Sequence, residues 1–297
     1  MKRMGLVLLL LAAAALPASA SDADVVRIGI VADIHVHDTD SPCELGGAKV
    51  MVNYAERIEA FVEAMNAWPA EVVIDLGDFV NGVFVMCEDL GDPERVPGLL
   101  DTGLAVLSAF EGPIYHVIGN HDVYDLTKEE YLAGIGAEST FYSFDIGAYH
   151  VVVLDAQYTK EGEDYGNVSW MVQGTVPPSE LAWLREDLQA TSKPTLVCIH
   201  QPLDVEYSFT AGGPPVWNHV EVCQVLAESG KVIAVFQGHT HENGYSLIDG
   251  IHYVTFAAMV DHAEPTPPSW AQVVLDALNR TITIEGFGLQ SSYELLY

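Results

Sequence analysis

The stretch Val25-Val26-Arg27-Ile28-Gly29-Ile30-Val31-Ala32-Asp33-Ile34-His35 is the most informative part of this chain. Its first eight residues are almost all apolar, which is typical of a β-strand that is covered on both faces. Asp33 and His35 follow the apolar run directly. Ligands of open α/β sheets bind at the carboxyl ends of the strands, so both side chains are candidate functional residues.

The same arrangement, an apolar run that ends in polar residues, recurs four times further along. The later motifs are Gly77-Asp78 with Asn81 three residues on, Gly119-Asn120-His121-Asp122, His200, and Gly238-His239-Thr240-His241. Carboxylate and imidazole groups of this kind bind divalent metals. Two such ions about 4 Å apart can neutralise a phosphate ester and convert a bound water molecule to hydroxide. The five motifs therefore predict a two-metal hydrolytic centre, with the Asp78 carboxylate placed to bridge the ions.

Strand and helix signals alternate along the chain. Apolar runs that predict buried strands lie at 72–76, 114–118, 149–154, 195–199, 232–236 and 251–256. One helix face is predicted from the spacing of Ile58, Phe61, Val62 and Met65. Further helices are predicted around 181–188 and from Asn218 to Gly230, and two hairpins at 141–154 and 273–284. The alternation predicts an α/β fold with a largely parallel sheet, and the hairpins predict a second sheet or antiparallel edges on the first.

The set D-x-H, G-D-x-x-N, G-N-H-D, a single histidine and G-H-x-H resembles that of the calcineurin-like metallophosphoesterases. The motifs extend from Asp33 to His241, about two thirds of the chain. The resemblance implies a four-layer α/β/β/α sandwich with mixed sheets and a metal site at the carboxyl ends of the strands. The five-motif set is most similar to that of the class III cyclic-nucleotide phosphodiesterases, and it is shared by secreted phosphomonoesterases and some nucleotide-diphosphate hydrolases.

The resemblance also implies a role for each motif residue. The metal ligands would be Asp33, His35, Asp78 and His241 for one ion, and Asp78, Asn120, His200 and His239 for the other. His121 would be the general acid or a phosphate contact, and Asp122 would position it. The two ions are expected to be manganese, iron or zinc, divalent or trivalent. Asn81 stands where purple acid phosphatases carry a tyrosine, so a tyrosinate-ligated purple iron is not expected.

These residues lead us to expect a metal-dependent phosphoesterase that acts on a small phosphate ester, either a monoester or a diester. Two alternatives stay open: a pyrophosphohydrolase of the nucleotide-diphosphate type, and a non-catalytic metal-dependent binding protein on the same fold. The long connections 157–178 and 201–217 are expected to form a substrate-binding rim. The other interpretation is that their aromatic residues pack as in ordinary surface loops.

The charge of the chain narrows the range of partners. Twelve basic and 42 acidic residues give a net charge of −30. Such a surface repels nucleic acid and anionic lipid. A phosphate site in this protein needs a local source of positive charge, and metal cations are the expected source. Neither nucleic-acid binding nor membrane association is therefore expected, and the oligomeric state is left open.

The first 20 residues have the pattern of a signal peptide. Lys2 and Arg3 precede an apolar segment at 5–16, and Ala18-Ser19-Ala20 has the form of a cleavage site. We expect residues 21–297 to form a single domain in the periplasm or outside the cell.

Four cysteines remain to be placed in the fold. Export permits disulfides, and we predict one between Cys43 and Cys87, which lie in the loops after the first two motifs. Cys198 and Cys223 lie in a predicted strand and a predicted helix, so we expect buried thiols there.

Overall fold

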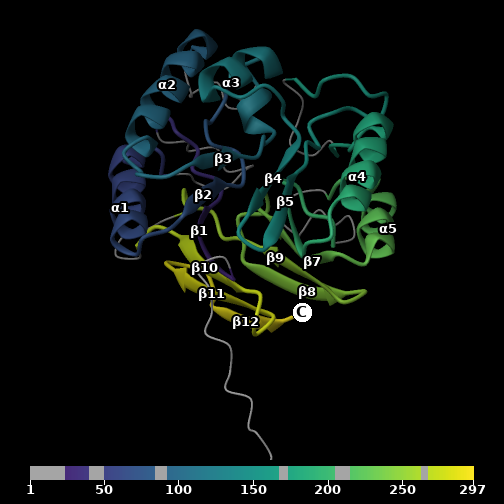
Figure 1. Cartoon of the computed structure of the whole chain (residues 1–297). Coiled ribbons are helices and arrows are strands. Elements are labelled where there is room, and N and C mark those ends of the chain that lie inside the picture. The colour runs from purple at the N-terminus through teal and green to yellow at the C-terminus, as the bar shows by residue number, and fades with distance from the viewer. Residues whose placement is uncertain (1–23, 40–49, 84–91, 167–172, 205–214, 262–266) are drawn as a thin grey trace, which may run out of the picture.

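The computed structural model describes residues 24–39, 50–83, 92–166, 173–204, 215–261 and 267–297. Within these segments the chain forms two six-stranded sheets with helices on their outer sides (Figure 1). Helices α1 and α2 lie on one side of the molecule, and α4 and α5 lie on the other. This is the four-layer α/β/β/α sandwich with mixed sheets that the sequence predicts.

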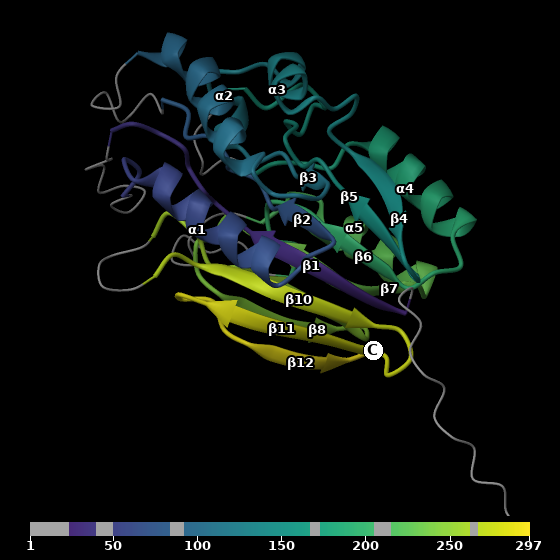
Figure 2. The same cartoon turned by 60° about the vertical axis from the view of Figure 1, so that its left-hand side comes forward.

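The first sheet combines a parallel part with an antiparallel part. Its strands, in spatial order, are β12 (Tyr293–Leu296), β11 (Thr281–Phe287), β10 (Trp270–Asp276), β1 (Val25–Val31), β2 (Val72–Asp75) and β3 (Ile114–His116). Strands β1, β2 and β3 are parallel, whereas β10 to β12 are antiparallel (Figure 2). The hairpin predicted at 273–284 is therefore confirmed as β10 and β11.

The second sheet has a parallel centre and antiparallel edges. Its order is β4 (Tyr142–Ile146), β5 (Tyr149–Val153), β6 (Thr195–Cys198), β7 (Val232–Gln237), β9 (Ile251–Thr255) and β8 (Gly244–Ile248). Strands β5, β6, β7 and β9 are parallel, and β4 and β8 pair antiparallel at the edges. The predicted hairpin at 141–154 is confirmed as β4 and β5.

The helices fill the two outer layers. Their bounds are α1 Tyr54–Ala67, α2 Val96–Leu107, α3 Lys128–Ile135, α4 Pro178–Ala190 and α5 His219–Ser229, with short 3-10 turns η3 at Pro93–Arg95 and η4 at His121–Val123. The predicted face of α1 is buried at all four positions. Helix α5 ends at Ser229, close to the predicted end, and its C-cap residue Gly230 adopts the left-handed conformation.

The main core lies between the two sheets. Residues such as Ile28 and Ile30 of β1 and Val151 and Val153 of β5 belong to one buried cluster. Two further clusters lie beneath the helices on either side. Because both faces of the central strands are covered, these strands are continuous apolar runs, and the strand ends are the first places where polar side chains can meet.

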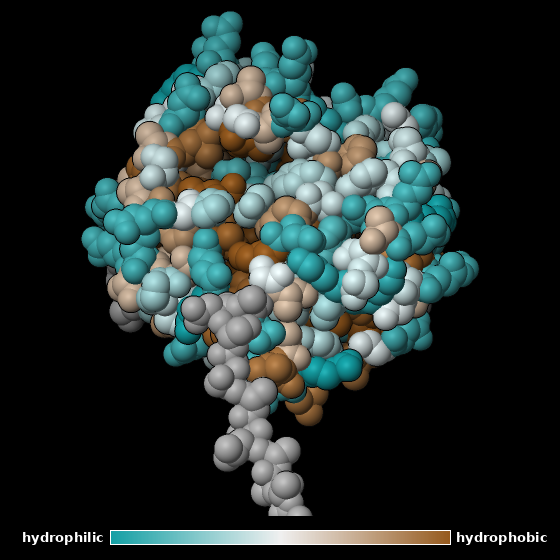
Figure 3. Space-filling model, in the orientation of Figure 1, coloured by the Kyte–Doolittle hydropathy of each residue, from teal (hydrophilic) through white to brown (hydrophobic). Residues whose placement is uncertain are grey.

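The surface is mainly hydrophilic on the face drawn in Figure 3, with small apolar patches, as the acidic composition predicts. No helix among the described residues is both long and apolar enough to span a membrane. Cys198 is a buried free thiol and Cys223 a partly buried one. The predicted signal peptide and the predicted Cys43–Cys87 disulfide lie outside the described residues.

Candidate metal centre

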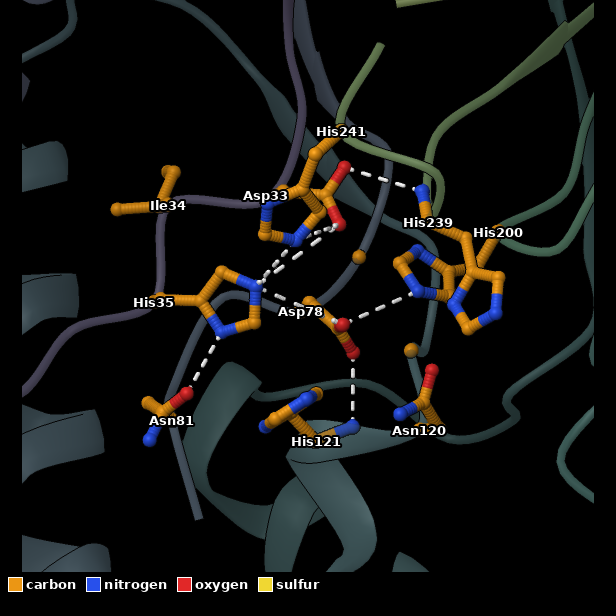
Figure 4. Close-up of polar contacts among 12 residues, drawn as sticks. Asp33, Ile34, His35, Asp78, Asn81, Asn120, His121, His200, His239 and His241 are labelled. Atoms are coloured by element: carbon orange, nitrogen blue, oxygen red, sulfur yellow. Dashed lines mark hydrogen bonds and ion pairs between the residues drawn. The ribbon is translucent and has the colours of Figure 1, made fainter. Parts of the chain in front are cut away.

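The residues of the five motifs come together at the carboxyl ends of the strands (Figure 4). The loops after β1, β2 and β3 of the first sheet contribute Asp33, His35, Asp78, Asn120 and His121. The loops after β6 and β7 of the second sheet contribute His200, His239 and His241. The centre therefore lies where the two sheets meet, and Asp78 is in its middle.

Five of these residues have an unusual backbone conformation. Positive φ angles of 49° to 69° occur at Asp33, His35, Asp78, His239 and His241. L-residues rarely adopt this region, and such residues cluster at functional sites because the surrounding structure must hold them there. Backbone hydrogen bonds between the loops do so here: Asp33 N donates to Gly77 O (3.0 Å) and His35 N to Asp78 O (2.9 Å).

Two motif glycines are explained by close approaches to the carboxylates. A Cβ atom at Gly119 would lie 2.2 Å from Asp78 Oδ1, and one at Gly238 would lie 2.7 Å from Asp33 Oδ2. Neither distance is possible for carbon and oxygen. The glycines of G-N-H-D and G-H-x-H are therefore needed for the loops to pack against the carboxylates.

The first candidate metal position is surrounded by Asp33, His35 and His241, whose ligand atoms lie within 4.8 Å of one another. The Nε2 atoms of the two histidines are 3.2 Å apart. Asp33 Oδ1 lies 3.6 Å from His241 Nε2, and it accepts no hydrogen bond among the described residues although it is fully buried. Two imidazole nitrogens and a carboxylate oxygen that face one point form a donor set that fits a transition-metal cation.

The second candidate position is surrounded by Asp78, His200 and His239, also within 4.8 Å of one another. His200 Nδ1 lies 2.8 Å from the carbonyl oxygen of Leu76, which requires an N–H donor at Nδ1. The Nε2 atom faces Asp78 Oδ2, 3.2 Å away, and is the ring atom left for a cation. In the described part of the chain, the buried Asn120 Oδ1 is also without a hydrogen-bond partner, as expected of an oxygen left for a cation.

The charges at this centre favour a bound cation. Burial raises the pKa of Asp33 to about 6. Burial acts to lower the pKa of His200, but the charges of Asp78 and Asp33 and the hydrogen bonds of the ring overcome it and raise that pKa to about 10. Without metal, protons thus compensate the buried carboxylates, and a cation would replace them.

His121 lies beside the candidate positions and is partly exposed. Its backbone N donates to Asp78 Oδ1 (2.7 Å), and its ring centroid is 4.6 Å from that of His35. One nitrogen of the ring lies within 4.8 Å of ligand atoms of both His35 and Asp78. This location suits a group that transfers a proton to or from a substrate, and it is also close enough for a metal ligand.

Asp122 acts differently from our prediction that it positions the His121 ring. Its Oδ2 accepts hydrogen bonds from the backbone N of Asp78 (3.0 Å) and Gly119 (2.8 Å), and its Oδ1 accepts from Val80 N (3.0 Å). Burial and the charge of Asp78 raise the pKa of Asp122, while the amides of Val80 and Gly119 oppose this rise. Asp122 therefore holds the loops that carry Asp78 and Asn120. The sequence could not indicate this, because it shows only that Asp122 adjoins His121.

Three residues outside the predicted ligand set orient members of it. His35 Nδ1 is 2.9 Å from Asn81 Oδ1, Asn120 Nδ2 donates to Tyr124 Oη (3.0 Å), and His241 Nδ1 is 2.8 Å from Asp261 Oδ2. The sequence pattern included Asn81 but missed the other two. The signal for Asp261 was present, since it directly follows the apolar residues 256–260, which extend the run at 251–256.

Comparison with known proteins agrees with this geometry. Residues 26–243 match the family model described as "Calcineurin-like phosphoesterase". The chain belongs to this family. The resemblance inferred from the motifs is thereby confirmed.

The relatives of this phosphoesterase include two kinds of enzyme. The chain is 24% identical to the manganese-dependent ADP-ribose/CDP-alcohol diphosphatase of Arabidopsis thaliana, over 90% of this chain and 96% of that protein. It is 25% identical to a probable cyclic nucleotide phosphodiesterase of Psychrobacter arcticus, over 58% of this chain and 57% of the relative. A crystal structure of a dimetal phosphatase from Danio rerio has the same fold, with a TM-score of 0.76 and 20% identity, over 92% of this chain and 99% of the other.

Family membership and the donor set together establish the general activity. This protein is a metal-dependent phosphoesterase with a dimetal site. The assignment of individual ligands stays a prediction, and the geometry supports it.

Proposed function

We propose that this phosphoesterase is a manganese-dependent diphosphatase that cleaves the P–O–P bond of nucleotide-diphosphate esters such as ADP-ribose or CDP-alcohols. The sequence motifs leave this reaction open beside monoester and diester hydrolysis. We favour it because relatives described as manganese-dependent ADP-ribose/CDP-alcohol diphosphatases match 78–91% of this chain, over 83–96% of their own length. Relatives described as probable cyclic nucleotide phosphodiesterases match 55–80% of this chain, over 57–81% of their own length.

The observation that carries the proposal is a pair of adjacent donor clusters, Asp33 with His35 and His241 and Asp78 with His200 and His239, in which Asp78 Oδ2 also lies 3.7 Å from His35 Nε2. A diphosphate ester brings negative charge on both phosphoryl groups, and no lysine or arginine is among the residues labelled in Figure 4. When bound, the two metals would supply that positive charge and an activated water molecule. The protein would bind the first ion through Asp33, His35, Asp78 and His241. It would bind the second through Asp78, Asn120, His200 and His239.

His121 is the residue we assign to the leaving group. Breaking a P–O–P bond leaves a phosphate oxygen that takes up a proton or is stabilised by a donor. His121 lies at the open side of the centre, and its backbone is held to the Asp78 carboxylate. From this position its ring can donate to the departing oxygen while the ligands stay in place.

Hydrolysis of a cyclic phosphodiester is the second candidate. The five-motif pattern and the similarity to the Psychrobacter arcticus relative favour it. Both reactions need the same two clusters, so they differ in how the protein would accommodate the rest of the substrate.

A direct test is turnover by purified protein loaded with Mn²⁺, with ADP-ribose, 3′,5′-cyclic AMP and p-nitrophenyl phosphate compared at equal concentration. We expect AMP and ribose 5-phosphate from ADP-ribose, at a higher kcat/KM than for the other two substrates. A preference for cyclic AMP would replace the first candidate by the second. Asp78→Asn protein is the control for contaminating hydrolases, and activity that survives this change would not come from the centre.

We also propose that the protein is exported after removal of residues 1–20. The support is the sequence alone: Lys2 and Arg3, the apolar segment 5–16 and Ala18-Ser19-Ala20. Protein recovered from the cell envelope fraction or the medium should begin at Ser21 when its N-terminus is sequenced. An intact N-terminus on protein confined to the cytoplasm would contradict export, without affecting the proposed chemistry.

A further inference from the structure

We propose that Asp261 is a positioning residue for the metal centre, and that it selects the tautomer and the orientation in which His241 binds metal. The inference rests on the dimetal site and on no particular substrate. It concerns a carboxylate that lies outside the five motifs and follows strand β9.

The geometry places the His241 imidazole between Asp261 and the first metal position. Asp261 Oδ2 is 2.8 Å from His241 Nδ1. On the other side of the ring, Nε2 faces His35 Nε2 at 3.2 Å and Asp33 Oδ1 at 3.6 Å. A carboxylate at Nδ1 holds the proton there, so that the lone pair of Nε2 points at the cation.

The backbone explains why Asp261 is in this place. After β9 the chain crosses from the second sheet to the first. Ala258 N donates to His241 O (3.1 Å), Met259 N to Ala32 O (2.9 Å) and Val260 N to Asp33 O (3.1 Å). The side chains of Ala258, Met259 and Val260 are buried. The segment is therefore held by both ligand loops at once, and Asp261 is its first residue with a partly exposed side chain.

His241 depends on such a partner more than other histidine ligands do. Its side chain is 16% exposed, whereas those of His35 and His200 are fully buried. The ring of His200 is oriented by the carbonyl of Leu76, and that of His35 by the neutral amide of Asn81. A ring at the edge of the site has fewer packed neighbours to fix it. The charged partner also makes Nε2 a stronger ligand than a carbonyl or an amide would.

The test is Mn²⁺ binding by the purified protein, followed without substrate by electron paramagnetic resonance and calorimetry. Loss of a hydrogen-bonding partner behind a histidine ligand typically weakens metal binding by about 10- to 100-fold. We therefore expect Asp261→Ala to weaken the binding of one of the two Mn²⁺ ions by this factor. The affinity for the other ion should stay near its wild-type value. Asp261→Asn, which keeps an acceptor but loses the charge, should lie between wild type and Asp261→Ala.

Asp145→Asn is the matched control. Asp145 Oδ1 lies 2.7 Å from His150 Nδ1, so this change also neutralises a carboxylate beside a histidine, at the β4–β5 hairpin. It should leave the affinity for both ions unchanged. Wild-type affinity for both ions in Asp261→Ala would overturn the proposal. Equal weakening of the binding of both ions would also overturn it. So would a fall in melting temperature without a loss of affinity at one metal position. Because no substrate is present, these outcomes are independent of whether the protein is a diphosphatase.

Discussion

The two sheets contribute different chemistry to the centre. The loops of the first sheet supply both carboxylates, the Asn120 amide and the imidazole of His35, whereas those of the second supply imidazoles only. Both candidate metal positions take groups from both sheets. Asp78 lies between them, with its Oδ2 atom 3.7 Å from His35 Nε2 and 3.2 Å from His200 Nε2. Neither sheet alone supplies all the donors of either candidate metal position. Metal affinity in this protein therefore depends on how the two sheets pack against each other.

The largest expected effect comes from the first sheet. Asp78→Asn removes the one charge that both metal positions share, so we expect loss of both ions and no turnover above the metal-free blank. Elemental analysis of the purified variant measures its metal content, and an assay with the best substrate measures its turnover. Retention of two ions would show that Asp78 does not bridge.

Removing an imidazole of the second sheet should have a smaller effect. His241→Ala leaves Asp78, Asn120, His200 and His239 in place, so we expect one ion to be retained and one to be lost. Mn²⁺ titration followed by electron paramagnetic resonance would show the change in stoichiometry. If both ions were lost, the two positions would be more tightly coupled than the geometry indicates.

His121→Ala separates chemistry from metal binding. General acid catalysis typically contributes about 10² to 10⁴ in rate, so kcat should fall by this factor with both ions kept. The loss should be smaller for p-nitrophenyl phosphate, because its leaving group needs little protonation. Equal losses for good and poor leaving groups would remove His121 from the acid role, and loss of an ion would make it a ligand.

Removal of both metals should lower stability without unfolding the protein. A ligand that binds the folded state alone stabilises it by about 2.7 kcal/mol at 100 times its Kd. One kcal/mol shifts the melting temperature by about 2–4 °C in domains of 150–250 residues. We therefore expect chelation to lower it by several degrees, and added Mn²⁺ to restore it. An unchanged melting temperature would contradict the view that the ions connect the two sheets.

The smallest effect concerns the predicted Cys43–Cys87 disulfide. Mass spectrometry of a non-reduced digest of exported protein should show the linked peptides. Reduction should speed metal release while the melting temperature changes little, since a chain of this length buries a large core without cross-links. Free thiols at both positions in exported protein would rule out the bridge.

Much of the fold could be predicted because its signals are local. The continuous apolar runs of β1, β2, β5, β6 and β7 reflect burial on both faces, which the chain needs wherever a strand lies in the middle of a covered sheet. The spacing of Ile58, Phe61, Val62 and Met65 likewise records which side of α1 faces the core. The polar residues directly after such runs could therefore be predicted to lie together at the carboxyl ends of the strands.

The hydrogen-bond partners of those polar residues could not be predicted from the sequence. Asp122 follows His121 in the chain, but its carboxylate binds backbone amides of the loop after β2, more than 40 residues away. Asp261 reaches His241 because a segment after β9 crosses between two loops that are joined to different sheets. Residue types and their order indicated the chemistry, since metals and phosphate esters require particular donor groups. Which groups orient those donors followed from sheet packing and backbone hydrogen bonds between distant loops, and neither leaves a local pattern in the sequence.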